Sequence, residues 1–204
     1  MKSYFRFLSR NKLYTAIEVV GLSIALAFVV FIATFVAGEL GYDKDLKNTK
    51  NIYLSHGEEF SIMSYTAGDV IKQEYPQVED VCRFISTSIL SGMAYEVTIG
   101  GETFPQKAII ADDNFFDFFT FPFVEGGLED RDAVVVSQSF ANTHFQEQSP
   151  IGKTIQITVG ENKKDLFIQG IYKDIKKSVF PDADIIYGTH HIKAMYPALI
   201  AEGN

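Results

Sequence analysis

Disulfide bonds and a basic surface are the two features that this sequence most clearly lacks. Cys82 is the only cysteine among 204 residues, so no intrachain disulfide can form, and the fold must depend on burial of Val, Ile and Phe side chains. Basic side chains are scarce after the N-terminal region, because residues 38–204 hold 14 Lys and Arg against 25 Asp and Glu. This balance of −11 repels phosphate backbones and anionic headgroups, which argues against a nucleic-acid partner.

Charged side chains are also missing from one long stretch near the start. Residues 19–37, VVGLSIALAFVVFIATFVA, contain none. At about 1.5 Å per helical residue this stretch reaches roughly 28 Å, the thickness of a hydrocarbon core. A cleaved signal peptide is the alternative, but its apolar region is usually shorter and ends in small residues at positions −3 and −1, where Phe35 stands before Ala37. We therefore predict an uncleaved membrane anchor, with no second apolar run of this kind after it.

The charges around the apolar run predict its orientation. Four basic residues precede it with no acid among them: Lys2, Arg6, Arg10 and Lys12. The positive-inside tendency therefore keeps the N-terminus in the cytoplasm and places everything after Ala37 outside. We expect a cytoplasmic basic head at residues 1–12 and a transmembrane helix with a short stalk at residues 13–45, which makes the lipid bilayer a partner of the chain.

The outer part begins with a predicted strand, helix and strand. Residues 51–59 and 78–86 have strand patterns, and residues 66–75 between them have apolar positions on one helical face and stop before Pro76. These elements form the first part of an α/β lobe at residues 46–92. From about residue 93 the apolar period changes to two, which predicts a β-rich lobe at residues 93–177. Residues 178–204 begin with a strand pattern and then become ambiguous.

Turn and capping residues divide the β-rich lobe into smaller elements. Gly100 and Gly101 can supply the positive φ angles of a hairpin between residues 94–99 and 102–111. Asp112 and Asp113 are expected to cap a short helix that ends at residue 119, and Ser137 a helix that ends at residue 145. The remaining expected strands are residues 133–137, a hairpin of residues 154–159 and 165–175 with a turn at 160–164, and residues 182–188.

The stretch SPIGKTI, residues 149–155, contains the Gly-Lys-Thr that ends a phosphate-binding loop. Such a loop also needs a glycine five positions earlier, a strand before it and a helix that starts inside it. Glu147 occupies the glycine position, a helical pattern precedes the stretch and a strand pattern follows it. We therefore predict a turn that leads into the strand at residues 154–159, and no nucleotide site.

Candidate catalytic and metal-binding residues do not form a recognisable set. His190 and His191 are adjacent, which should point them apart on a strand or a helix, so we predict two surface histidines. Asp182 and Asp184 share a strand face and could hold a cation, but strand alternation explains them equally well. The aspartates at 43 and 45 start like a calcium loop but lack its glycine at the sixth position and its glutamate at the twelfth. Cys82 lies in an apolar strand pattern, where a thiol is poorly placed as a nucleophile. We predict no catalytic residue, no cofactor, no metal and no enzymatic activity.

The densest apolar feature is NFFDFFTFPF, residues 114–123, which contains six phenylalanines. Their rings can pack inside the β-rich lobe or form an exposed patch for a partner. Core packing is the better interpretation, because large exposed apolar patches are rare. In either case a charge at Phe119 should be damaging.

Taken together, these segments resemble the ABC transporter permeases that have a MacB-type periplasmic core domain, also called FtsX-like permeases. The head FRFLSRNKLYTAIEVVGLSIALAFVVFIATFVAGELGYDK resembles the first membrane helix of that family. ADDNFFDFFTFPFVEGG, AVVVSQSFANTHF, SPIGKTIQI and DLFIQGIYKDI follow in the order of the periplasmic domain's own patterns. The similarity covers nearly the whole chain, although a complete permease of this type has at least four membrane helices, so a fragment or a truncated gene product is expected.

The resemblance implies an α+β fold, with one N-terminal transmembrane helix followed by a two-lobed periplasmic domain in which a β-rich lobe is inserted into an α/β lobe. Residues 178–204 would then be an incomplete return into the α/β lobe. It implies a non-catalytic subunit of the bacterial inner membrane, in which a cytoplasmic ABC ATPase drives movement of the periplasmic domain, a mechanism called mechanotransmission. The implied partners are that ATPase, a second permease copy or half, and periplasmic adaptor or outer-membrane components. Glu39, Tyr42 and Asp43, where the helix leaves the membrane, form the candidate coupling joint.

Two other classes of protein remain open from the residues. A single-span adaptor or sensor that only binds a partner would show the same anchor and outer domain. A membrane-tethered periplasmic hydrolase would also need a nucleophile, metal or acid-base set, and the sequence offers no clear one. An ATPase gene beside this one would favour the permease over the adaptor.

Overall fold

The computed structural model describes residues 10, 12–40, 51–55, 63–90, 95–146, 148–174, 180 and 182–196. The chain forms two compact units, residues 1–42 and 43–204. The described part of the first unit is one helix, α2 (Lys12–Glu39), of 28 residues, none of which is buried. It is the one helix among the described residues that is long and apolar enough to cross a membrane, judged by length and composition. The predicted apolar N-terminal helix is therefore present, and none of its residues is buried.

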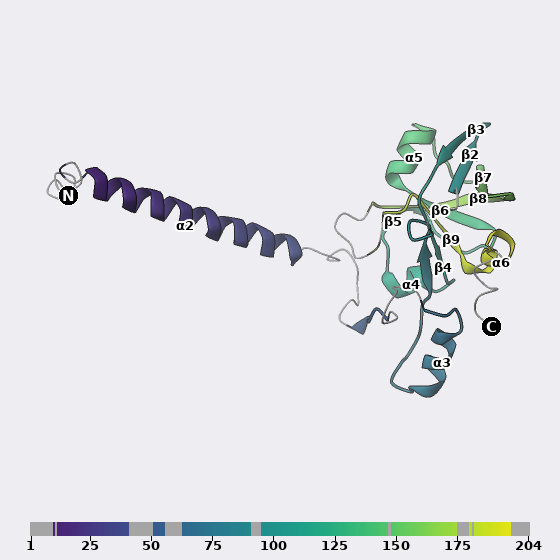
Figure 1. Ribbon diagram of the computed structural model, residues 1–204. Helices are drawn as coiled ribbons and strands as arrows, with labels where there is room; N and C mark the ends of the chain where they lie inside the picture. The colour runs from purple at the N-terminus through teal and green to yellow at the C-terminus, as the bar shows by residue number, and fades with distance from the viewer. Residues whose placement is uncertain are drawn as a thin grey trace. The chain divides into compact units, whose positions relative to one another are not determined.

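The second unit is built on one nine-stranded sheet (Figure 1). The strand order is β1-β4-β9-β6-β8-β7-β2-β3, and β5 also pairs with β8. Two neighbouring pairs, β4 with β9 and β6 with β8, are parallel, and the other pairs are antiparallel. The strands are β1 (Phe84–Ser86), β2 (Tyr95–Ile99), β3 (Glu102–Pro105), β4 (Ala108–Ala111), β5 (Phe123–Gly126), β6 (Ala133–Ser137), β7 (Thr154–Val159), β8 (Asn162–Tyr172) and β9 (Ile185–Gly188).

Short helices complete the unit, and some of them cover the two faces of the sheet. They are α3 (Ala67–Glu74), α4 (Phe115–Phe119), α5 (Gln138–Phe145), the 3₁₀ turn η2 (Thr189–His191) and α6 (Ile192–Met195). Alternate residues of the central strands point to opposite faces, so Val134 and Val136 pack with α5 and α6, whereas Val135 packs with the phenylalanines of α4. Figure 1 shows α4 and α6 on opposite sides of β4 and β9. The predicted α+β class is confirmed, with helices on both faces of a mixed sheet.

Several local predictions are confirmed. Ser137 caps α5, because its hydroxyl accepts a hydrogen bond from the Phe140 backbone N–H at 3.0 Å. Gly100 and Gly101 turn the β2–β3 hairpin with φ angles of 59° and 89°. Residues 151–152 form the predicted turn before β7, where Gly152 has a φ of 80°. The Gly-Lys-Thr therefore leads from a turn after α5 into β7, as predicted.

The phenylalanine-rich run lies in the core, as predicted. Phe115, Phe119 and Phe121 are buried, and the other three phenylalanines of the run pack against them half-buried. Phe180 joins the cluster with ring centroids 4.6 Å from Phe119 and 5.6 Å from Phe115. This cluster fills the face of the sheet that carries α4.

Several local predictions were wrong. Residues 51–55, the described part of the expected strand at 51–59, include no strand, and Tyr53 is 88% exposed there. The strand expected at 78–86 is only β1, because pairing with β4 extends over three residues. The run 102–111 is two strands, since β3 pairs with β2 whereas β4 pairs with β1 and β9. Asn114, not Asp112 or Asp113, is the N-cap residue of α4, and its side chain makes no capping bond.

The predicted lobe boundaries cut across this sheet. β1 falls in the predicted segment 46–92, β4 in 93–177 and β9 in 178–204, yet β4 pairs with both of the others. Pairing between strands distant in the sequence therefore joins the three predicted segments. The division into two lobes stays a prediction.

Candidate functional site

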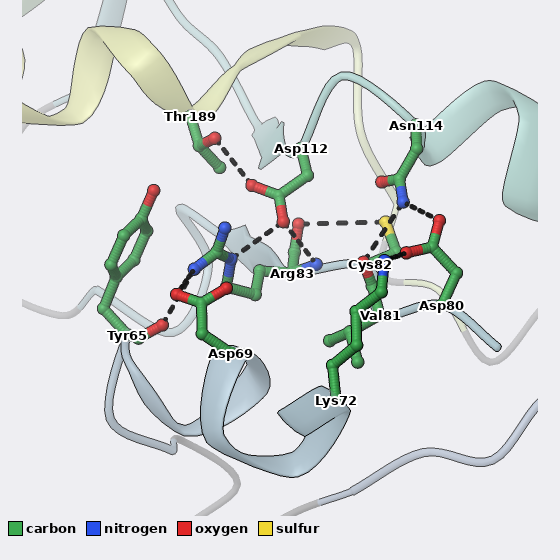
Figure 2. Close-up of polar contacts among 10 residues, drawn as sticks. All are labelled: Tyr65, Asp69, Lys72, Asp80, Val81, Cys82, Arg83, Asp112, Asn114 and Thr189. Carbon is green, nitrogen blue, oxygen red and sulfur yellow. Dashed lines mark hydrogen bonds and ion pairs between the residues drawn. The ribbon is translucent and has the colours of Figure 1, made fainter. Parts of the chain in front are cut away.

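A polar junction around Arg83 connects α3 to the sheet (Figure 2). The Arg83 Nε lies 2.8 Å from the Asp112 Oδ2, and the Arg83 backbone N–H donates to the same oxygen at 3.0 Å. The Asp112 side chain is 14% exposed and that of Arg83 is 29% exposed. This ion pair is therefore partly shielded from water, which strengthens it relative to a surface pair.

Strand pairing explains why these residues meet. β1 and β4 are antiparallel, and their paired residues at this end are Phe84 and Ala111. The next residues, Arg83 and Asp112, therefore face each other, and the Asp112 N–H donates to the Arg83 carbonyl at 2.9 Å. β4 and β9 are parallel, with Ala111 opposite Gly188, so the next residues, Asp112 and Thr189, are also neighbours. The Thr189 hydroxyl donates to the Asp112 Oδ1 at 2.8 Å. Both carboxylate oxygens of Asp112 are therefore held by groups that the sheet positions.

The opposite side of Arg83 faces α3 and the residues before it. The Arg83 Nη1 donates to the Tyr65 carbonyl at 3.1 Å and to the Asp69 Oδ2 at 3.2 Å. The guanidinium carbon lies 4.3 Å from the centre of the Tyr65 ring, within the range of a cation–π contact. Arg83 thus joins two partners near α3 to one partner at the end of β4.

A second ion pair lies beside the first. The Lys72 Nζ of α3 is 2.6 Å from the Asp80 Oδ1, and the Asn114 amide donates to the Asp80 Oδ2 at 2.8 Å. The hydrogen bond from Lys72, followed by that from Asn114, lowers the pKa of Asp80 below its usual value. Asp80 therefore stays ionised, and it links α3 to the start of α4.

Electrostatics keep both Arg83 and Cys82 protonated. Partial burial opposes the charge of Arg83, but the hydrogen bond and the charge of Asp112 outweigh it, so the pKa of Arg83 is raised. Burial, and then the nearby charges of Asp112 and Asp80, raise the pKa of the Cys82 thiol to about 12. Little thiolate exists at neutral pH, which agrees with the prediction that Cys82 is poorly placed as a nucleophile. The junction is suited to holding segments together.

The residues of the predicted coupling joint are only partly described. Glu39 is the last residue of α2 and is exposed. Tyr42 and Asp43 lie outside the described residues. The joint therefore stays a prediction.

The Arg83 junction was missed by sequence reasoning. A signal was present, because Arg83 interrupts the apolar pattern VCRFIS and a charge in such a strand requires a partner. The identity of that partner depends on the pairing of β1 with β4, which local patterns do not specify.

The structure corrects the prediction for the two adjacent histidines. His191 is 5% exposed, not a surface residue, and the two rings lie together with centroids 4.0 Å apart. The Nε2 atoms of His190 and His191 lie 2.5 Å and 2.9 Å from one acceptor, the Arg131 carbonyl. The strand ends at Gly188, and the compact 3₁₀ turn turns both rings toward the loop before β6. Among the described residues, no group of three or more His, Cys, Asp or Glu is arranged to hold a metal ion.

Acidification is expected to destabilise the folded domain through His191. Burial, and then the charge of the neighbouring His190, lower the pKa of His191 below its usual 6.5. The unfolded chain therefore binds the proton at a higher pH than the folded chain. The contribution of neutral His191 to the free energy of unfolding is present above about pH 6.5 and is lost as the pH falls. The loss ends below the pKa that His191 has in the folded chain. In His191→Gln, which keeps a nitrogen donor for the Arg131 carbonyl, the urea midpoint should change less over this range.

Tyrosine fluorescence can follow this unfolding, since the chain has 10 tyrosines and no tryptophan. His144→Gln is the matched control, because that half-buried ring stacks with Phe104 and Phe140 in another part of the domain. The same reduction in pH dependence in both variants, or none in His191→Gln, would show that His191 is not responsible.

Comparisons with known proteins agree with the described architecture. The described fold is similar to a crystal structure of a domain assigned to a permease protein of Porphyromonas gingivalis, with 21% sequence identity and a TM-score of 0.54. The match covers 71% of this chain and 58% of that domain. It is also similar to the periplasmic region of MacB from Actinobacillus actinomycetemcomitans, with 15% identity, a TM-score of 0.51, and coverage of 76% of this chain and 74% of that region.

At these identities the structural likeness shows the fold, and the family comes from the sequence. No curated protein matches the chain. The family model described as the MacB-like periplasmic core domain matches residues 15–198, which is most of the chain. The chain therefore belongs to the family of the MacB-like periplasmic core domain.

Proposed function

We propose that this chain is the N-terminal part of a non-catalytic permease subunit of an ABC exporter, and that it couples ATP hydrolysis in the cytoplasm to movement of its periplasmic domain. The observation that carries the proposal is the combination of an exposed, apolar 28-residue helix with a MacB-like core domain that follows it. The helix is long enough to cross a bilayer, and a stiff helix can transmit displacement along its axis.

The proposed topology follows the charges of the sequence. Arg10 and Lys12 lie at the N-terminal end of α2, and Lys2 and Arg6 precede them in the sequence. The positive-inside tendency places this end in the cytoplasm and the core domain in the periplasm. An apolar helix before a periplasmic core domain fits a protein of the bacterial inner membrane.

The proposed partners lie on both sides of that membrane. We propose a cytoplasmic ABC ATPase, as a separate chain or a fused domain, and a second permease copy or half beside this one. Periplasmic adaptor or outer-membrane components would complete an export path. The chain spans 58% of the Porphyromonas domain, and all of these partners are proposals.

We propose that the coupling joint consists of Glu39, Tyr42 and Asp43. In the intact permease with its ATPase, inserting two glycines between Tyr42 and Asp43 should abolish most ATP-driven export while ATP hydrolysis continues. Glycine has the greatest backbone freedom, so the insertion makes the connection compliant and displacement is lost there. The measurement is export and ATP hydrolysis in the same proteoliposomes.

The matched control inserts the same two glycines after Gly100, in the exposed turn of the β2–β3 hairpin. This control should export at nearly the wild-type rate, because a surface turn tolerates added residues. Wild-type export by the Tyr42–Asp43 insertion would refute the joint. Failure of an ATPase to copurify with the permease would favour the adaptor alternative.

A further inference from the structure

α3 is attached to the domain in a different way from the other helices. Gly68 is its only buried residue, whereas α5 buries two phenylalanines and an alanine against the sheet. Val70 is 48% exposed, and Tyr75, which follows the helix, is 55% exposed. The apolar side chains of Ala67 and Ile71 are only half-buried, so apolar burial contributes less to the position of α3 than to that of α5.

The contacts that hold α3 are mostly polar and exposed. The Arg83 Nη1 reaches Asp69, whose side chain is 64% exposed, and Lys72 pairs with Asp80, with side chains 53% and 45% exposed. Ion pairs at such exposure contribute little to stability and are weakened by salt. Gly68 approaches Val81 closely, and an added Cβ would lie 2.9 Å from the Val81 Cγ1.

The other half of the Arg83 junction does not depend on α3. Asp112 receives the Arg83 Nε, the Arg83 backbone N–H and the Thr189 hydroxyl, all from residues that the sheet positions. Its side chain is 14% exposed, compared with 64% for Asp69. When Asp69 and Tyr65 leave, Arg83 can therefore remain in place on Asp112.

We propose that α3 is a detachable element, which docks on a guanidinium fixed to the sheet and opens while the sheet stays folded. The two ends of the Arg83 guanidinium have different roles. The Nε end is the permanent anchor on Asp112, and the Nη1 end is the releasable catch for Asp69 and the Tyr65 carbonyl. Elements with little buried apolar surface and exposed polar contacts open at a lower free energy than the core does. This inference does not rest on the proposed function.

Hydrogen exchange measured by mass spectrometry on the full chain in detergent micelles tests the proposal. In the wild-type protein, peptides from α3 should exchange at least about 100-fold faster than peptides from β6, because α3 opens locally and β6 exchanges through global unfolding. Raising the salt concentration should increase exchange in α3 and leave β6 unchanged, since the releasable contacts are ionic.

Two variants distinguish loss of the contacts that the catch makes from a change in the helix propensity of α3. Asp69→Asn removes one partner of the catch, and Arg83→Lys keeps a charge for Asp112 but loses the fork that reaches Asp69 and Tyr65. Each should increase α3 exchange about two- to fivefold without changing β6. Arg83→Lys matters because it leaves the α3 sequence unaltered, so a change there cannot come from helix propensity.

Asp165→Asn is the matched control, because this exposed carboxylate accepts a hydrogen bond from Gln156 on the β7–β8 pair and does not contact α3. It should leave α3 exchange at the wild-type level. The proposal is overturned if α3 and β6 exchange together in the wild-type protein, if both catch variants leave α3 unchanged, or if they accelerate β6 equally.

Discussion

Replacement of Phe119 by Asp is expected to leave almost no folded core domain. Phe119 is 7% exposed, and its ring centroid lies 4.6 Å from that of Phe180 and 5.0 Å from that of Phe115. Removing a buried phenylalanine ring costs about 3–5 kcal/mol, and an unpaired carboxylate in the same place adds a further desolvation penalty. This sum is comparable to the whole stability of a typical domain, roughly 5–15 kcal/mol.

The measurement is urea unfolding of the full chain in detergent micelles, followed by tyrosine fluorescence. Val124→Asp is the matched control, since Val124 is 53% exposed and the substitution introduces the same charge only five positions later. The control should lose about 0.5 kcal/mol or less, as is typical of exposed positions. Similar stabilities for the two variants would contradict the assignment of Phe119 to the core.

The second large effect is expected at Gly126, in the bulged pairing of β5 with β8. Gly126 has a φ of 68°, and a Cβ added there would overlap the carbonyl oxygen of Gln169. Gly126→Ala must therefore adopt an unfavourable backbone conformation and also push β5 away from β8. Gly100 has a similar φ of 59° but nothing within 4 Å of its added Cβ.

Gly100→Ala thus isolates the conformational cost, about 1–2 kcal/mol, from the steric one. Gly126→Ala should lose about 1–3 kcal/mol more than Gly100→Ala in the same urea titration. If the two variants have equal midpoints, the β5–β8 approach is looser than described.

The local elements that could be predicted from the sequence share one property: a few neighbouring residues specify them. Ser137 predicts the cap of α5 because the bond it makes spans three residues. The glycine pair predicts the β2–β3 hairpin because both positive φ angles belong to the turn itself. The Phe-rich run predicts core packing because six large rings have few alternatives to burial.

The wrong predictions concern residues whose partners lie far away in the sequence. Residues 102–111 look like one strand, and they separate into two because β3 and β4 have different partners. Asp112 looks like a helix cap, and it instead binds Arg83, 29 positions earlier, and Thr189, 77 positions later. His191 looks like a surface residue, and it is buried against the carbonyl of Arg131, 60 positions away.

The sequence by itself determined the apolar helix, the family and the order of most strands and helices, because each is encoded in composition or in a period of a few residues. Only the tertiary structure decided that β1, β4 and β9 lie side by side, and therefore that Arg83, Asp112 and Thr189 form one junction beside α3. The physical reason is that side-chain periodicity shows which face of a strand is buried, whereas the choice of neighbour depends on register and packing across the whole sheet.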